Sequence, residues 1–314
     1  MGGRRVLVAG ATGTIGRAVV AALSAAGAQP VALVRPGRAA AAPDGAEAVE
    51  LDLTDPALPG ALGQADGVIS CLASRGGAPA DAWAVEHQAQ LRLLAATEGA
   101  GRFVLLSAIC VQKPKLEFQR AKLAFEAALR HSGRSFAIVR PTAFFKSLSG
   151  QAERVRSGKP FLLFGDGSLT ACKPISDRDC AEYLVRCLDE PGAEGRILPI
   201  GGPGPALTPR EQGEALFAAF GREPKFRHVP VRMMDAIIGG LSLAGRVSPA
   251  MADKAEFARI GRYYATESML VLDPQSGRYD ADATPETGTE TLPEFYRRLA
   301  AGEATVDLGA HAVF

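Results

Sequence analysis

The chain has 314 residues, 47% of them apolar, so it can bury one large core or two modest ones. Its 35 Lys and Arg nearly balance its 34 Asp and Glu, which excludes a global basic field of the kind that binds nucleic acid. The five cysteines contain no C-x-x-C pair, which argues against a disulfide framework, an iron–sulfur cluster or a zinc site. We therefore expect reduced thiols in a cytoplasm and no bound metal.

We expect neither a signal or transit peptide nor a membrane-spanning segment. The first strand-like run begins at Arg4, which leaves no room for a signal or transit peptide. The most apolar late stretch, residues 236–245 (AIIGGLSLAG), is shorter than the about 20 residues that cross a bilayer. We expect it to form a core helix, with contact to a membrane surface as the alternative.

The N-terminal half alternates short β-branched runs with helical patterns. The predicted strands cover residues 4–9, 30–34, 67–71, 102–107 and 135–140, and the predicted helices cover 14–27, 82–97 and 115–133. Strands that alternate with helices form a parallel sheet with helices on both faces. The sequence therefore predicts an α/β fold with a Rossmann-like, doubly wound parallel sheet.

Beyond residue 141 the alternation becomes irregular. Residues 160–175 (PFLLFGDGSLTACKPI) predict two strands joined by a Gly-Asp-Gly turn. A helix is predicted over 175–192, a strand over 195–202 and a further helix over 207–221, where Thr208, Pro209 and Glu211 form a capping pattern. We expect residues 1–141 to form the Rossmann-like core. Residues 142–314 would form a smaller C-terminal substrate-binding region, interleaved with the last strands and helices of the core at about 171–201.

The first strand runs into GATGTIG, which places Gly10, Gly13 and Gly16 three residues apart. Glycine permits a tight turn and a close approach to a pyrophosphate, and the N-terminus of the next helix supplies free N–H groups. Because the motif lies between a strand and a helix at the start of a βαβ unit, it predicts a dinucleotide site rather than a plain turn. The other predicted cofactor-binding residues of this loop are Thr12, Thr14 and Ile15.

The residue after the second strand selects the dinucleotide, and here it is Arg35, followed by Arg38. An Asp or Glu at this point would bind the ribose hydroxyls of NAD, whereas two guanidinium groups suit a 2′-phosphate. NADP(H) is therefore the predicted cofactor, and solvated loop arginines are the alternative. Asp52, after the third strand, is placed to meet the adenine. The predicted cofactor site also includes Leu53, Cys71, Pro141 and Thr142.

Short-chain dehydrogenases place a Ser at the end of the fifth strand and a Tyr and a Lys four residues apart on the next helix. Ser107 and Lys122 occupy the Ser and Lys positions and are the predicted catalytic residues, with Lys122 also binding the cofactor ribose. The residue four before Lys122 is Phe118, which cannot transfer a proton. A missing phenol matters least when a carbon–carbon double bond is reduced, because water or Lys122 could then protonate the neighbouring carbon.

Long blocks of the sequence resemble the divinyl chlorophyllide a 8-vinyl-reductase family. They include EFQRAKLAFEA (117–127), SFAIVRPTAFFKSLSGQ (135–151), GKPFLLFGDGSLTACKPISDRD (158–179) and GRYYATESMLVLDP (261–274). The resemblance runs from about residue 4 to about residue 299. The glycine motif alone is similar to that of the wider NmrA-like and isoflavone-reductase-like group of atypical short-chain dehydrogenases.

The resemblance implies NADPH-dependent reduction of the 8-vinyl group of divinyl chlorophyllide a or protochlorophyllide a to an ethyl group, in chlorophyll or bacteriochlorophyll synthesis. It implies a bacterial-type cytoplasmic enzyme, with contact to the photosynthetic membrane as an open alternative. Two other functions stay open: an NADP(H)-sensing NmrA-like regulator, and a reductase of another small apolar substrate. The oligomeric state and the identity of the proton donor also stay open.

A flat macrocycle with a carboxylate edge needs apolar faces and a cation. Phe144, Phe145 and Phe161 are the predicted substrate-binding residues, with ordinary core packing as the alternative for each. Lys146, Lys173 or Arg262 could pair with the propionate. The pocket is expected at the carboxyl ends of the strands, where open parallel sheets bind ligands.

Overall fold

A seven-stranded parallel sheet organises the computed structural model, which describes residues 3–55, 62, 64–74 and 76–306. In the strand order β3-β2-β1-β4-β5-β6-β8, the chain adds β2 and β3 on one side of β1 and then crosses to add β4 on the other side, as in a doubly wound sheet. The strands are β1 (Arg5–Ala9), β2 (Gln29–Val34), β3 (Glu47–Glu50), β4 (Gly67–Ser70), β5 (Arg102–Leu106), β6 (Phe136–Pro141) and β8 (Arg196–Ile200). All neighbouring pairs are parallel, so the predicted fold class is confirmed.

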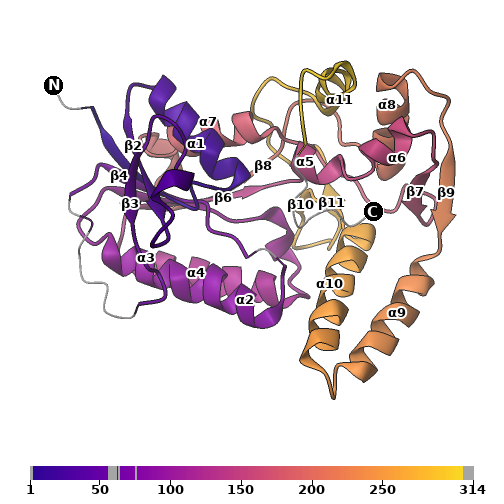
Figure 1. Cartoon of the computed structure of the whole chain (residues 1–314), viewed down its shortest axis with the longest axis horizontal. Helices are drawn as coiled ribbons and strands as arrows, with labels where there is room; N and C mark the ends of the chain where they lie inside the picture. Colours follow the sequence, from indigo (N-terminus) through magenta and orange to yellow (C-terminus); the bar gives the residue numbers. More distant parts are fainter. Residues whose placement is uncertain (1–2, 56–61, 63, 75, 307–314) are drawn as a thin grey trace.

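Helices cover both faces of the sheet (Figure 1). One face carries α1 (Thr14–Ala25) and α7 (Asp177–Arg186), and the other carries α2 (Pro79–Trp83), α3 (Gln90–Ala96) and α4 (Glu117–His131). Successive residues of a strand point to opposite faces. Val8 of β1 accordingly packs in the cluster with α1 and α7, while Leu7 packs in the cluster with α3 and α4.

The predicted cap at Thr208 is present, and α7 also begins with a capping side chain. Thr208 and Glu211 form a reciprocal capping box at the start of α8 (Pro209–Ala219), whose first residue is proline. The Ser176 hydroxyl accepts a hydrogen bond of 3.0 Å from the Asp179 backbone N–H at the start of α7. These side chains satisfy backbone donors that a helix N-terminus leaves free.

The helix predicted over residues 82–97 contains an irregularity. It consists of α2, a π-helical turn η2 (Ala84–Ala89) and α3. Single π turns insert one extra residue and change the direction in which the neighbouring side chains point. Glu86 lies in this turn and is only 3% exposed.

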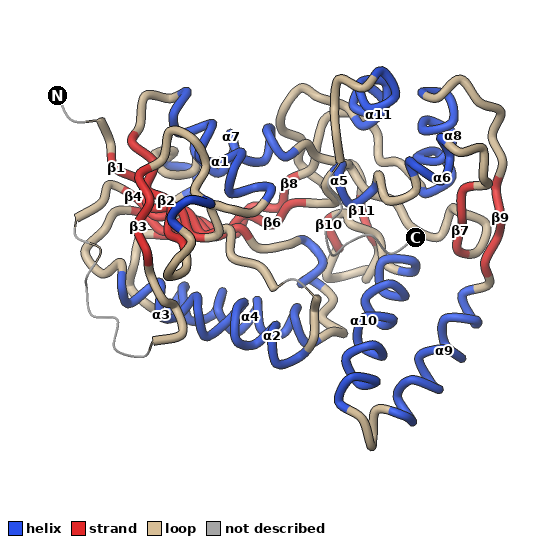
Figure 2. Tube along the Cα trace, in the orientation of Figure 1, coloured by secondary structure: helices blue, strands red, loops and turns tan. Residues whose placement is uncertain are grey.

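Of the two strands predicted on either side of the Gly-Asp-Gly turn at Gly165 and Gly167, the structure forms the first, β7 (Phe161–Phe164), but not the second. Strand β7 pairs in parallel with β9 (Phe226–Val229), which comes from a distant part of the chain (Figure 2). Both glycines have positive φ angles of 64° and 84°, so the chain does turn there. After the turn, Cys172 forms bridges with Leu207 and Met269 instead of returning along β7. A turn signal locates a reversal but does not name the pairing partner.

Shorter elements complete the C-terminal part. They are α5 (Phe145–Leu148), α6 (Ala152–Arg156), α11 (Leu292–Ala301) and the antiparallel pair β10 (Val271–Leu272) and β11 (Tyr279–Asp280), with 3₁₀ turns η1 (Ala39–Ala41), η3 (Ile109–Gln112) and η4 (Pro191–Ala193). Residues of α5, α6, β7, α8 and α11 share one hydrophobic cluster, separate from those of the large sheet. Helix α7 and strand β8, which come from residues 171–201, belong to the large sheet layers.

Helices α9 (Val231–Ala244) and α10 (Pro249–Thr266) form a hairpin that extends away from the sheet (Figure 1). The core-helix prediction for residues 236–245 is wrong, because no residue of α9 is buried. Ile237 and Leu243 are 50% and 64% exposed. An apolar helix sequence predicts burial only when another element covers it, and α9 has α10 on one side. None of the helices within the described residues is long and apolar enough to cross a membrane.

Candidate active site at the carboxyl edge of the sheet

The predicted site residues lie directly after the strands. Gly10 follows β1, Arg35 follows β2, Cys71 follows β4 and Ser107 follows β5, while Thr142 follows β6. Because all these strands are parallel, their carboxyl ends form one edge of the sheet. The structure therefore brings the predicted residues to the edge at which such sheets bind ligands.

The glycine loop has the shape that a pyrophosphate requires. Gly10 has φ 74°, and a Cβ atom there would lie 2.5 Å from the Cys71 carbonyl oxygen. A Cβ on Gly16 would lie 2.1 Å from the Gly10 carbonyl oxygen, so helix α1 can approach the loop only through glycine. Gly13 is the N-cap of α1, and Gly13 and Thr14 are exposed at its N-terminus. This bare helix end fits the phosphates of a dinucleotide.

Thr12 is also exposed in the loop, and its carbonyl oxygen accepts a hydrogen bond of 3.1 Å from Arg17 Nε. Ile15 is half-buried and packs against the cluster on the α1 side of the sheet. Within the loop, Thr12, Gly13 and Thr14 are therefore the exposed residues, and none has a large side chain.

Arg35 and Arg38 are exposed beyond β2, and neither guanidinium has a hydrogen bond or ion pair within the described ranges. Both are available to an anionic group. Asp52 is exposed after β3, and hydrogen bonds of 2.6 and 2.8 Å from the Thr54 hydroxyl and backbone N–H lower the pKa of its carboxyl. Leu53 is half-buried against the cluster on the α3 side.

Three further predicted cofactor residues contribute shape rather than free polar groups. Burial raises the pKa of Cys71 to about 12, so this residue is a neutral thiol. Pro141 is buried at the end of β6. The Thr142 hydroxyl donates to the Lys173 carbonyl oxygen and is buried, so it fixes the chain after β6.

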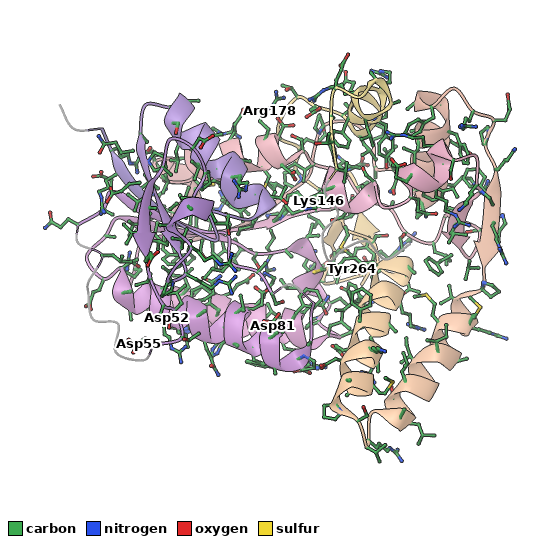
Figure 3. All side chains as sticks on the ribbon, viewed as in Figure 1. Asp52, Asp55, Asp81, Lys146, Arg178 and Tyr264 are labelled. Atoms are coloured by element: carbon green, nitrogen blue, oxygen red, sulfur yellow. The ribbon has the colours of Figure 1, made fainter. Side chains whose placement is uncertain are left out.

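Lys146 lies at the glycine loop. Its Nζ donates a hydrogen bond of 2.9 Å to the Thr14 hydroxyl, which places the ammonium beside the N-terminus of α1 (Figure 3). Asp177, in the field of Lys146, has a pKa raised to about 6 by burial. The Lys146 charge thus adds to the positive end of the α1 dipole where a phosphate would bind.

Lys122 is held by a buried carboxylate that the sequence did not reveal. Its Nζ lies 2.7 Å from Glu86 Oε2, and the two side chains are 11% and 3% exposed. The other oxygen, Oε1, accepts hydrogen bonds of 2.9 and 3.1 Å from the Ser74 backbone N–H and hydroxyl. The π-helical turn carries Glu86, so this irregularity supplies the partner of Lys122. With its hydrogen bonds satisfied, the buried pair fixes the ammonium in one position.

Ser107 is also committed to a buried acid. Its hydroxyl donates a hydrogen bond of 2.5 Å to Glu126 Oε1, and Glu126 forms an ion pair with Arg140. Glu126 lies one helical turn after Lys122 on α4. One helix therefore supplies both Lys122 and the acid that orients Ser107. Glu86, Ser107 and Lys122 line one small cavity, which places the two predicted catalytic residues together.

Phe118 is 9% exposed and packs in a cluster with Ile109, Tyr263 and Met269. Helix α10, which carries Tyr263, therefore covers the position that holds the phenol in short-chain dehydrogenases. The next residue, Tyr264, is 45% exposed, and its hydroxyl lies 3.9 Å from Cys110 Sγ. No local signal in the sequence relates these tyrosines to α4, because the contact spans more than 100 residues.

The structure does not place the three predicted stacking residues on one exposed face. Phe145 and Phe161 are 2% and 4% exposed in the hydrophobic cluster of α5, β7, α8 and α11. Their rings already contact other side chains, such as Phe295 and Phe226. Phe144 is half-buried against the cluster of α1 and α7.

Each propionate-binding candidate already has a partner. Lys173 Nζ lies 2.6 Å from Glu286, and the lysine side chain is only 8% exposed. Arg262 pairs with Asp235 and so joins α10 to α9. Lys146 points to the glycine loop.

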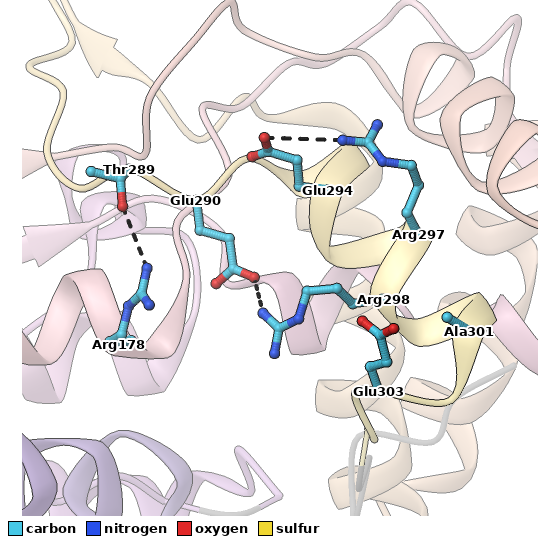
Figure 4. A pocket seen from close by; sticks show the side chains of 8 residues that line it. All are labelled: Arg178, Thr289, Glu290, Glu294, Arg297, Arg298, Ala301 and Glu303. Atoms are coloured by element: carbon cyan, nitrogen blue, oxygen red, sulfur yellow. Dashed lines mark hydrogen bonds and ion pairs between the residues drawn. The ribbon is translucent and has the colours of Figure 1, made fainter.

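A surface cavity of about 530 Å³ lies away from these residues, between the start of α7 and α11. It is lined by Arg178, Thr289, Glu290, Glu294, Arg297, Arg298, Ala301 and Glu303 (Figure 4). Arg297 and Arg298 pair with Glu294 and Glu290, so the charges largely compensate one another. Seven of the eight lining residues are charged or polar, whereas a flat macrocycle needs aromatic or aliphatic side chains to stack on.

The comparisons with known proteins agree with the geometry. Residues 10–191 match the family described as NAD(P)H-binding. An NADPH-dependent quinone oxidoreductase from Escherichia coli, solved with NADPH, has a TM-score of 0.65 at 20% identity and covers 94% of this chain and 99% of that one. The fold and the glycine loop thus define an NAD(P)H-binding protein of the Rossmann type.

The sequence relatives narrow the class. Divinyl chlorophyllide a 8-vinyl-reductase, chloroplastic, from Oryza sativa subsp. indica is 49% identical over 98% of this chain and 82% of its own length. The protein of the same name from Arabidopsis thaliana is 46% identical, over 97% and 79%. The chain belongs to the divinyl chlorophyllide a 8-vinyl-reductase family, and the resemblance drawn from its sequence blocks is confirmed.

Restoring the phenol on α4 should not help this protein. In Phe118→Tyr the new hydroxyl enters an apolar cluster, and an unpaired buried hydroxyl costs about 1–3 kcal/mol. We expect a lower melting temperature and no increase in kcat, measured by thermal unfolding and by the reductase assay. Phe118→Leu is the control for ring loss, and a tenfold rise in kcat for Phe118→Tyr would contradict the account.

Proposed function

We propose that this chain catalyses the NADPH-dependent reduction of the 8-vinyl group of divinyl chlorophyllide a, or of the corresponding protochlorophyllide, to an ethyl group. The observation that carries the proposal is 46–49% identity, over 97–98% of the chain, to reductases named for this activity. The site is compatible with it: a vinyl group has no oxygen that must gain a proton, and Phe118 provides no phenol.

The residues of the chain then have separate tasks. Bound NADPH supplies the hydride. The loop from Gly10 to Gly16 and the Lys146 ammonium hold the pyrophosphate, while Arg35 and Arg38 take the 2′-phosphate.

Lys122 is the residue assigned to the nicotinamide ribose. Glu86 holds its ammonium in place, so its N–H groups can donate to the ribose hydroxyls. Ser107, oriented by Glu126, lies beside Lys122 and Glu86 around the same small space. Together these groups position the reacting carbons without supplying a base.

The substrate is hydrophobic, and the enzyme would meet it at a membrane surface from the aqueous side. Support comes from the α9–α10 hairpin, where Met233, Ile237, Leu243 and Val247 are between 49% and 89% exposed. Exposed apolar side chains on a projecting helical hairpin suit contact with the interfacial layer of a bilayer.

The direct test is to incubate the pure protein with NADPH and divinyl chlorophyllide a and to follow the Soret band. We expect a blue shift as the conjugated vinyl group becomes an ethyl group, with a matching loss of NADPH absorbance. Cofactor binding without either change would favour an NADP(H)-sensing regulator instead. Turnover of other small apolar acceptors alone would favour a different reductase.

Arg35→Asp should weaken use of NADPH much more than use of NADH. A charged hydrogen bond contributes about 1.5–3 kcal/mol, so the KM for NADPH should rise roughly 10- to 150-fold. The KM for NADH should stay level or fall, because the new carboxylate suits ribose hydroxyls. Arg246→Asp, on the exposed hairpin, is the matched charge control. An equal loss with both cofactors would remove the assigned role.

A further inference from the structure

Helix α10 brings two adjacent tyrosines to the carboxyl end of β5, and they have different surroundings. Tyr263 is 3% exposed, and its hydroxyl donates to the carbonyl oxygens of Cys110 and Lys113 at 2.8 and 3.1 Å. Tyr264 is 45% exposed, and within the described residues its hydroxyl has one partner, the Cys110 sulfur at 3.9 Å. Sulfur is a weak acceptor. Tyr263 is therefore structural, whereas the Tyr264 hydroxyl retains a proton to donate.

The Tyr264 hydroxyl belongs to the same neighbourhood as the catalytic pair. Cys110 lies in η3, three residues after Ser107, and the Lys122 charge acts on its thiol. The Glu86 carboxylate acts in turn on the Tyr264 hydroxyl. Burial of that hydroxyl, together with Cys110, raises the pKa of Tyr264 well above its ordinary value. The phenol consequently stays protonated at neutral pH.

The other nearby donors are already engaged. Loss of a proton from Lys122 would leave Glu86 as a buried, uncompensated carboxylate, which is strongly unfavourable. The Ser107 hydroxyl proton is directed at Glu126. Phe118 has no proton to give.

We propose that Tyr264, on α10, supplies the phenol that α4 lacks and protonates the vinyl carbon next to the one that accepts hydride. The inference rests on the proposed function. One C=C π bond is lost and two C–H bonds form, one with hydride from NADPH, which becomes NADP⁺, and one with the Tyr264 proton. The phenolate regains a proton from solvent once the reduced pigment has left; the exposed 45% of Tyr264 is its ring rather than its hydroxyl, which is buried beside Cys110.

Tyr264→Phe keeps the ring and removes the proton. We expect kcat to fall by about 10²–10⁴-fold, the range for loss of a general acid, with the KM values for NADPH and pigment nearly unchanged. Tyr263→Phe is the matched control: it should lower the melting temperature while kcat stays within about threefold, because the hydroxyl that it removes holds the backbone at Cys110 and Lys113.

A second substitution avoids any question of folding. Replacing Tyr264 with a fluorinated tyrosine keeps its shape and lowers its phenol pKa, so the basic limb of the kcat–pH profile should move to lower pH. An active wild type with Tyr264→Phe within threefold of it, or an unmoved basic limb, would overturn this inference alone. An inactive wild type would remove the proposed function, and the inference with it.

Discussion

The site depends on one buried ion pair, Lys122 with Glu86. Both side chains are almost removed from solvent, and removing one partner of such a pair costs about 3–5 kcal/mol because the other charge is left uncompensated. Ser74 satisfies the second carboxylate oxygen, so the pair has little freedom to rearrange. The ion pair therefore fixes the position of the π-helical turn after α2 relative to α4.

Helix α4 presents its functional residues at intervals of one turn. Phe118, Lys122 and Glu126 are four residues apart, and each meets a different element: α10, the π-helical turn and the end of β5. Phe118 packs among apolar side chains, whereas Lys122 and Glu126 each form an ion pair. Reduction of a carbon–carbon double bond requires a positioned cofactor and a proton donor. On the proposed function, α4 carries a residue for the first requirement, Lys122. The proton can then come from another helix.

Local spacing made the glycine loop and the position of Arg35 at a strand end predictable. The sequence spacing of Gly10, Gly13 and Gly16 indicates a turn, and Arg35 marks the end of a strand. Both are local properties of the chain. The residues expected to bind a pigment were less predictable. Phe145 and Phe161 have the composition of a stacking site but lie in a core, and Lys173 and Arg262 are occupied by partners from distant segments. The role of Glu86 was not predicted, because a π-helical turn leaves no signature in the residue pattern. The prediction that α9 is buried was wrong, because periodicity does not report which elements cover a helix.

The most direct measurement is a double-mutant cycle on Glu86→Gln and Lys122→Met, with the free energy of unfolding and kcat determined for all four proteins. Each single substitution should destabilise the fold by about 3–5 kcal/mol and reduce kcat severely. The double variant should be more stable than the sum predicts, with a coupling energy within about 0.5–3 kcal/mol, and no less active than Lys122→Met. Additive losses of stability, or a Glu86→Gln protein with unchanged kcat, would contradict the central role of the pair.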